Sequence, residues 1–152
     1  MRVEDVPAGA THDLRWRILR DSRPGAPVVF PEDSRPDAFH LAVRDPEGTI
    51  VAVASFSTEV TPHRPGRTAV RLRGMAVDWP AQHHGLGRLL ITTVVERLRR
   101  DGVEVLWCNA RDSAVGFYSR LGFEVIGEGF VLPESGIAHH VMVRDLGDLS
   151  PG

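Results

Sequence analysis

Two glycines stand at a point where the hydrophobic pattern changes, in the stretch Gln82-His83-His84-Gly85-Leu86-Gly87-Arg88. An apolar, strand-like run ends shortly before it, and a long amphipathic run follows it. Glycines at a strand-to-helix turn let backbone N–H groups converge on an anion with no Cβ in the way. The N-terminus of the following helix adds a dipole that favours negative charge. The stretch therefore predicts a site for a phosphate or a pyrophosphate.

Two familiar phosphate-binding motifs do not fit this stretch. A Walker loop needs Gly-Lys-Ser/Thr, but Arg88-Leu89-Leu90 follows the glycines. A dinucleotide fingerprint needs a third glycine at position 90, which is Leu. All 18 basic residues are Arg, and the absence of Lys also excludes Schiff-base catalysis and self-acylation on lysine.

Length and composition favour one globular domain. The chain has 152 residues, of which 42% are hydrophobic and 25% charged, and its net charge of −2 argues against long disorder. A pI near 6.4 argues against a general nucleic-acid binder. One cysteine, a charged N-terminus and the lack of a long apolar run predict a cytoplasmic protein without a membrane span. We expect a single domain over residues 1–146 and a polar tail over 147–152.

The elements that must position the glycine stretch can be read from periodicity and turn signals. The predicted order is β-α-β-β-β-α-β-α-β-β, which gives an α/β fold with a mixed, mostly antiparallel central sheet, flanking helices and a parallel crossover. Thr11 is the expected N-cap of the first helix, and Asp112 or Ser113 that of the third. The expected strands are 1–7 (an edge strand), 39–44, 49–60, 69–77, 103–108, 123–126 and 139–143, and the expected helices are 11–20, 86 to about 102, and 113–121.

Three linked segments resemble the GNAT superfamily of acyl-CoA-dependent N-acyltransferases. Arg73-Gly74-Met75-Ala76-Val77 resembles the family strand that ends in Ala-Val. Gln82 to Gly87 matches the family loop Gln/Arg-x-x-Gly-x-Gly, which holds a pyrophosphate. Phe117-Tyr118-Ser119-Arg120-Leu121-Gly122-Phe123 matches the family segment FYxxLGF. The resemblance covers roughly residues 39 to 145, and the three segments agree in order and spacing.

The resemblance implies acetyl-CoA as a co-substrate. The loop would hold the pyrophosphate of coenzyme A with backbone N–H groups, and His84 and Arg88 would add side-chain donors. The pantetheine arm would lie along residues 75–77, as an additional strand would. The cofactor-binding residues implied are Met75, Ala76, Val77, Gln82, His83, His84, Gly85, Leu86, Gly87, Arg88, Asn109 and Phe117.

Tyr118 resembles the family's general acid, which protonates the departing thiolate of coenzyme A. A phenol with a pKa of about 10 suits an alkyl thiolate leaving group. Spacing alone favours an aromatic core residue at Tyr118, and the resemblance of the motif favours the functional role instead. Asn109 would hydrogen-bond the pantetheine amide or the substrate amine; the alternative is that it caps the turn before Asp112.

The general base is less determined. Family members often carry Glu on the strand before Ala-Val, where this chain has Arg71 and Arg73. Gly136 to His140 resembles a GIPH element that some members carry near the active site, so the resemblance favours His139. Its imidazole, with an ordinary pKa of about 6.5, suits deprotonation of an ammonium. The alternatives are a water chain or one of three other side chains, Glu59, Asp78 and His140.

The resulting prediction is an N-acetyltransferase that moves an acetyl group from acetyl-CoA to a primary amine by direct attack in a ternary complex. The alternative is a non-catalytic acyl-CoA-binding sensor or partner module of the same fold. No metal is expected, because adjacent histidines point apart and no spaced ligand motif is present. The acceptor is a small-molecule or peptide amine, shaped by residues 21–38 and 130–140. Neither nucleic acid nor a membrane is an expected partner, and exposed strand edges would allow a homodimer.

Overall fold

The computed structural model describes residues 1–147, which form two compact units. Unit 1 comprises residues 1–58 and 72–94, and unit 2 comprises residues 59–71 and those from 95 onward. The predicted tail lies outside the described residues except for Gly147. The elements in chain order are β1 (Val3–Val6), η1 (Ala8–Thr11), α1 (His12–Leu14), η2 (Arg15–Leu19), η3 (Pro31–Ser34), β2 (Phe39–Arg44), β3 (Ile50–Thr58), β4 (Ala69–Val77), η4 (Trp79–Ala81), α2 (Leu86–Arg100), β5 (Val105–Arg111), η5 (Asp112–Ala114), α3 (Val115–Arg120), β6 (Glu124–Val131) and β7 (Ala138–Asp145).

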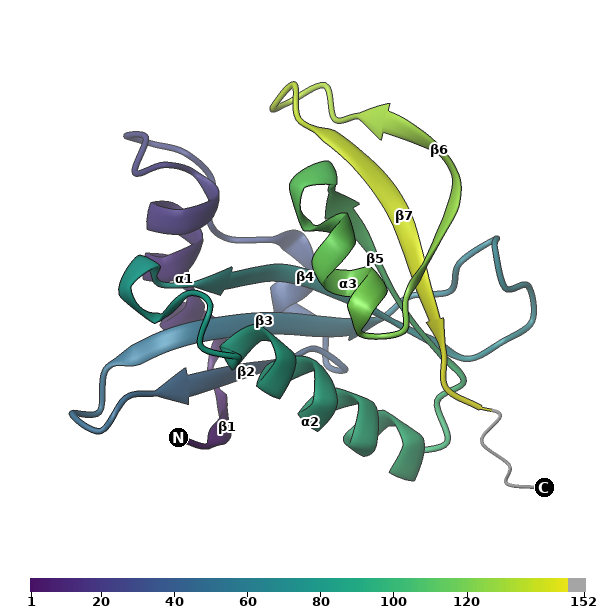
Figure 1. Cartoon of the computed structure of the whole chain (residues 1–152), viewed down its shortest axis with the longest axis horizontal. Coiled ribbons are helices and arrows are strands. Elements are labelled where there is room, and N and C mark those ends of the chain that lie inside the picture. Colours follow the sequence, from purple (N-terminus) through teal and green to yellow (C-terminus); the bar gives the residue numbers. More distant parts are fainter. Residues whose placement is uncertain (148–152) are drawn as a thin grey trace. The chain divides into compact units, whose positions relative to one another are not determined.

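The strands form one seven-stranded sheet in the order β1-β2-β3-β4-β5-β7-β6 (Figure 1). The pairs β1–β2, β2–β3, β5–β7 and β6–β7 are antiparallel, whereas β4–β5 is parallel. The predicted fold class, a mixed and mostly antiparallel sheet with one parallel crossover, is therefore confirmed. The order of strands and helices along the chain also agrees with the prediction.

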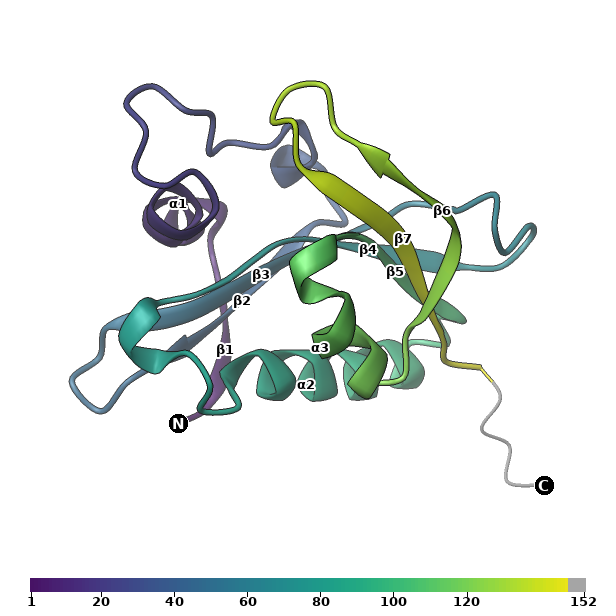
Figure 2. The same ribbon diagram turned by 45° about the horizontal axis from the view of Figure 1, so that its top comes forward.

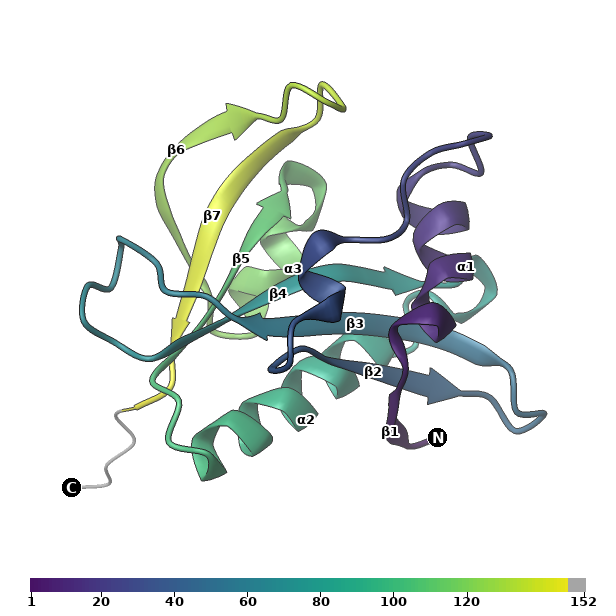
Figure 3. The ribbon, with the colours of Figure 1, turned by 180° about the vertical axis from the view of Figure 1, so that it is seen from behind.

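In unit 1, helical segments cover both faces of the sheet strands. Figures 2 and 3 show α1 and the segment after it on one face of β2 and β3, and the first turns of α2 on the other face. As a result β3 is buried from Val51 to Ser57 without alternation. The turn between β2 and β3 is held by the N–H of Gly48, which donates to Asp45 O at 2.9 Å. A buried cluster of Leu14, Ala42, Val53 and Ala76 forms the core.

The first helical segment differs from the expected regular helix over 11–20. It is a 3-10 turn, a short α-helix and a π-helix in succession. Thr11 does not cap it, because its hydroxyl donates to Ala8 O at 2.7 Å instead. This irregular winding turns the side chain of Arg15 into the core, where it is fully buried.

In unit 2, β5, β7 and β6 carry helix α3 on one face (Figure 1). The segment from Asp112 to Arg120 has no side-chain cap, so the predicted cap is wrong; Asp112 binds His140 instead. Gly122 has φ of +90° and ends α3, which is the left-handed cap that the sequence predicts. A cluster of Ala69, Val105, Trp107 and Val143 forms the core.

Helix α2 follows the predicted apolar stripe. Its buried residues recur at helical spacing, while three arginines gather in its last turn, where positive charge stabilises the helix dipole. Within residues 1–147, no helix combines the length and the apolar character that crossing a bilayer requires. The buried residues of α2 include Leu86, Leu90, Ile91, Val94, Val95 and Leu98.

Candidate active site

The predicted anion site begins where β4 ends, in unit 1. The N–H of Asp78 donates to Val51 O at 2.8 Å, which ties the end of β4 to β3. The short 3-10 turn η4 follows, and the side-chain amide of Gln82 then reaches back and donates to Val77 O at 2.9 Å. These contacts fold the chain back on itself, so Gln82 has a structural role that the motif alone does not reveal.

The backbone of the turn is unusual at two residues. His83 has φ of +67° and Gly85 has φ of +81°. Left-handed geometry costs a residue with a Cβ roughly 1–2 kcal/mol, so the strain at His83 has to be compensated by the surrounding structure. Gly85 has no heavy atom within 4 Å of the position a Cβ would take. The turn is therefore shaped by backbone conformation rather than by side-chain packing.

Helix α2 starts directly after Gly85, whose carbonyl accepts a hydrogen bond from the N–H of Leu89 at 3.0 Å. The first N–H groups of any helix have no partner within the helix, and here they belong to Leu86, Gly87 and Arg88. Gly85 and the Arg88 side chain are exposed, whereas Gly87 is buried. The N-terminus of a helix of this length, preceded by a glycine turn, has the geometry that binds phosphate oxygens.

An arginine from the first helical segment clamps this turn. The two Nη atoms of Arg17 donate to the two carboxylate oxygens of Asp78, each at 2.9 Å. The hydrogen bonds from Arg17 hold the pKa of Asp78 below its ordinary value. A carboxylate held this way is a poor proton acceptor, which argues against Asp78 as the general base. Sequence reasoning missed Arg17, because its partner lies 61 residues further along the chain.

Gly74, within strand β4, has φ of +64°. A Cβ there would lie 2.9 Å from Phe30 and 3.2 Å from Arg15 Nε, so glycine is required for both conformation and space. The three residues predicted to lie along the pantetheine arm follow it, with Ala76 buried and Met75 and Val77 half-buried.

Tyr118 lies on α3 in unit 2, only 7% exposed. Its ring makes edge-to-face contacts with Phe117 and Phe123, with centroids 5.0 and 5.2 Å apart. Burial, with a smaller effect of Cys108, raises the pKa of Tyr118 well above its usual value. Its phenol is therefore protonated at any pH at which the protein works. Both the predicted acid and the predicted core aromatic are compatible with this environment.

Asn109 and His139 lie on the paired strands β5 and β7. The register places Arg111 opposite His139 and Asn109 opposite Val141, so the two predicted site residues lie on the same face of the sheet. His139 Nδ1 lies 2.8 Å from Ile137 O. Because a carbonyl only accepts, Nδ1 carries the proton, and Nε2 of the neutral ring is left as a proton acceptor. The ring stacks on Phe130, with centroids 5.8 Å apart.

Two of the alternative bases are engaged elsewhere. His140 points to the opposite face from His139, and its Nδ1 lies 2.7 Å from Asp112 Oδ1. Glu59 Oε2 is 3.2 Å from Arg71 Nη1, and the same guanidinium lies over the Trp107 ring at 4.8 Å.

The predicted residues thus form two groups. The cofactor-loop residues 75–88 are brought together in unit 1, and Asn109, Phe117, Tyr118 and His139 belong to unit 2. Among residues 1–147, no group of three or more His, Cys, Asp or Glu side chains could hold a metal ion. Cys108 is buried, and desolvation raises the pKa of its thiol to about 12, which suits a structural residue rather than a nucleophile.

Comparison with known proteins bears directly on this site. A family model described as an acetyltransferase (GNAT) domain matches residues 31–146. The chain belongs to the GNAT acetyltransferase family. The uncharacterized N-acetyltransferase YitI of Bacillus subtilis is 34% identical over 143 residues, which are 94% of each chain.

Solved GNAT structures share the fold. An acyl-CoA N-acyltransferase from Pseudomonas aeruginosa superposes with a TM-score of 0.74 at 18% identity, covering 95% of this chain and 99% of that one. An aminoglycoside 6'-N-acetyltransferase complexed with coenzyme A gives a TM-score of 0.74 at 11% identity, with coverage of 96% and 97%. At these identities the likeness concerns the fold, and the predicted family is confirmed by the sequence matches.

Proposed function

We propose that this GNAT protein transfers an acetyl group from acetyl-CoA to a primary amine by direct attack in a ternary complex. The observation that carries the proposal is the turn before α2, where His83 and Gly85 adopt left-handed geometry and where Gly85 and the Arg88 side chain are exposed beside the start of the helix. Strain of this kind persists where the surroundings demand it, and a pyrophosphate supplies the anionic partner for the first N–H groups of the helix. The Arg88 side chain, exposed on the first turn, would contact a phosphate oxygen.

The strand segment 75–77 supports binding of the pantetheine arm. In this proposal the arm pairs with the part of β4 after Gly74, and Asn109 and Phe117 contact the arm or the bound amine. The carbonyl of Val77 already accepts from Gln82. The backbone N–H groups of the segment are therefore the donors to consider, and one near Val77 would polarise the thioester carbonyl.

Two side chains would handle the protons. The amine nitrogen attacks the thioester carbon, the C–S bond breaks, and the thiolate takes the phenolic proton of Tyr118. The amine loses its proton to Nε2 of His139, the ring atom that the Nδ1 contact to Ile137 O leaves unprotonated. Tyr118 holds its proton at neutral pH because burial raises its pKa, and the same shift makes the phenol a weaker acid toward the thiolate. Protonation of the leaving group by a positioned acid contributes typically 10²–10⁴-fold.

The test is a thiol-release assay with acetyl-CoA and a panel of primary amines, with the acetylated product identified by mass spectrometry. Wild-type protein should release one thiol per amide formed. Tyr118→Phe should lower kcat by about 100-fold or more while leaving the dissociation constant of acetyl-CoA within a few-fold. Ser119→Ala, one residue further along α3 and exposed, is the matched control. Binding of acetyl-CoA without thiol release from any amine would instead indicate a sensor module.

A further inference from the structure

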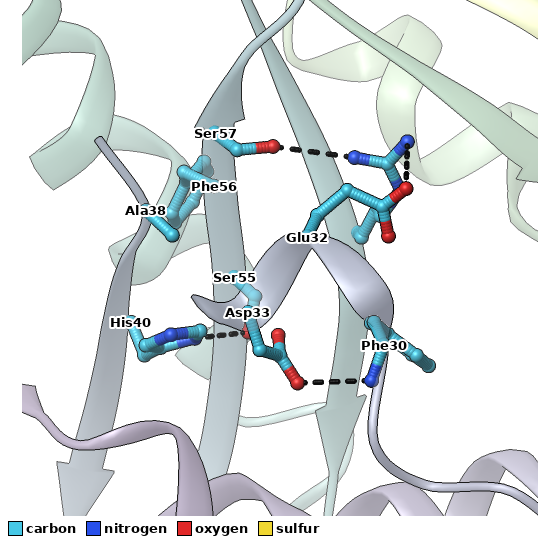
Figure 4. A pocket seen from close by; sticks show the side chains of 9 residues that line it. Phe30, Glu32, Asp33, Ala38, His40, Ser55, Phe56 and Ser57 are labelled. Carbon is cyan, nitrogen blue, oxygen red and sulfur yellow. Dashed lines mark hydrogen bonds and ion pairs between the residues drawn. The ribbon is translucent and has the colours of Figure 1, made fainter. Parts of the chain in front are cut away.

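A small pocket in unit 1 is lined by residues from the segment after the first helix, from β2 and β3, and from β4 (Figure 4). Its free volume of about 10 Å³ is room for one water. Its wall is part aromatic and part charged. The lining residues are Phe30, Glu32, Asp33, Ala38, His40, Ser55, Phe56, Ser57 and Arg73.

Arg73 supplies the positive charge of this pocket. Its side chain is 16% exposed, its Nη1 donates to Ser57 Oγ at 3.2 Å, and its Nη2 lies 3.4 Å from Glu32 Oε2. A guanidinium and a carboxylate in good contact form two parallel hydrogen bonds at about 2.7–2.9 Å. The Glu32 contact is longer than that, and the Glu32 side chain is 30% exposed. The Glu32 carboxylate is therefore the contact of Arg73 that another carboxylate could replace.

The other charged groups of the pocket are already committed. Asp33 accepts hydrogen bonds from both Nη atoms of Arg15, at 2.7 and 3.0 Å. His40 Nδ1 lies 2.7 Å from Ser55 Oγ, and desolvation lowers the pKa of its imidazole, which keeps the ring neutral near pH 7. An anion entering this pocket would thus be attracted by Arg73 alone among its lining residues.

The backbone that carries Glu32 is held by contacts on both sides, while the Glu32 side chain is 30% exposed. Arg15 binds Asp33, donates to Val28 O at 2.8 Å, and lies over the Phe30 ring at 3.8 Å. The η3 turn is therefore fastened on both sides of Glu32. Rotation of the Glu32 side chain toward solvent would open space for a carboxylate without any movement of the turn.

We propose that this pocket binds a carboxylate of the acceptor, so that the acceptor is an amine of the amino-acid class. The acceptor carboxylate takes the place of Glu32 on Arg73 and Ser57. This inference rests on the proposed function, because Arg73 stands two residues before Met75 on the strand assigned to the pantetheine arm. Two residues of strand span about 7 Å, so a carboxylate on Arg73 lies within one small molecule's length of that segment.

The experiment compares α-amino acids with the matching amines that lack the carboxylate. Wild-type protein should show a kcat/KM at least about 10-fold higher for the amino acid of each accepted pair, because its carboxylate makes an ion pair and hydrogen bonds with a half-buried guanidinium that the plain amine cannot make. Arg73→Gln should reduce that ratio to about 1 and leave kcat/KM for the plain amine within about 3-fold. Arg73→Lys should retain part of the ratio, since the charge remains but the bidentate geometry is lost.

Two further variants sharpen the assignment. Glu32→Gln should lower KM for the amino acid by roughly 2- to 5-fold, because it removes the competing carboxylate of a partly exposed ion pair. Arg35 lies on the same segment, and its side chain is 43% exposed. Arg35→Gln should leave the kinetic constants of both the amino acid and the plain amine unchanged. A wild-type preference for the plain amine, or a KM that rises in Glu32→Gln, would overturn the proposal.

A binding arm separates this inference from the proposed function. If no amine is acetylated, the proposed function fails. Titration calorimetry of the same amino acids against the protein without acetyl-CoA then tests whether the pocket binds a carboxylate. Binding that weakens at least 10-fold in Arg73→Gln but not in Arg35→Gln supports the carboxylate site. Equal affinity of the two variants, or binding of no amino acid, overturns it. Circular dichroism confirms that each variant is folded.

Discussion

Replacement of Asp33 by Asn tests whether the buried ion pair with Arg15 holds the segment that carries Glu32. The Arg15 and Asp33 side chains are 1% and 8% exposed, so water screens their interaction weakly. Asn keeps the shape of Asp but leaves the Arg15 charge buried without a counter-charge. Removal of one partner of a buried pair costs about 3–5 kcal/mol. At roughly 2–4 °C per kcal/mol for a chain of this size, Tm should fall by about 6–20 °C.

The assays are urea denaturation, which gives the free energy of unfolding, and thermal melting, which gives Tm, both followed by circular dichroism, with Asp13→Asn as the matched control. Asp13 also pairs with an arginine, Arg17, but its side chain is 71% exposed, and we expect a loss below about 1 kcal/mol. A loss in Asp33→Asn as small as in Asp13→Asn would refute the reasoning, because it would mean that Arg15 does not depend on this carboxylate.

The remaining predictions concern the glycine turn, the cysteine and pH. Gly85→Ala should lower the free energy of unfolding in urea by about 1–2 kcal/mol and weaken the binding of acetyl-CoA measured by calorimetry, because φ of Gly85 is +81°. Gly9→Ala, where a Cβ meets nothing within 4 Å, should change neither quantity. Cys108 should react with a thiol reagent only as fast as the protein unfolds, since burial raises its pKa to about 12, and fast labelling of the native protein would contradict this. Desolvation lowers the pKa of His40 in the folded state, so unfolding takes up a proton and stability falls as pH drops below about 6.5; His40→Gln should flatten the stability profile between pH 7 and 5.

Much of the fold was predictable because local signals coincide with tertiary ones. The strands 39–44 and 69–77 have the predicted bounds, since turn residues and period-two alternation mark their ends. Helix α2 was predictable from its apolar stripe, and the turn before it from Gly85 and Gly87. Each of these features is encoded within a few neighbouring residues.

The features that could not be predicted are contacts between residues far apart in the sequence. Arg15 lies in a helical pattern like any surface arginine, yet it is fully buried, and its Nη atoms bind Asp33 and Ser55, which lie 18 and 40 residues away. The clamp between Arg17 and Asp78 is a contact of the same kind. The left-handed conformation of His83 was also unpredictable, because glycine is the residue type that adopts positive φ about as readily as negative φ.

The most direct test of the central claim is transfer itself. Acetyl-CoA labelled with ¹³C at the carbonyl, incubated with the protein and a panel of amino acids, should give a ¹³C amide signal in NMR spectra together with an equal amount of free coenzyme A. A thioester signal that persists unchanged with every acceptor, while the protein binds acetyl-CoA, would contradict the assignment of this chain as an N-acetyltransferase of amines.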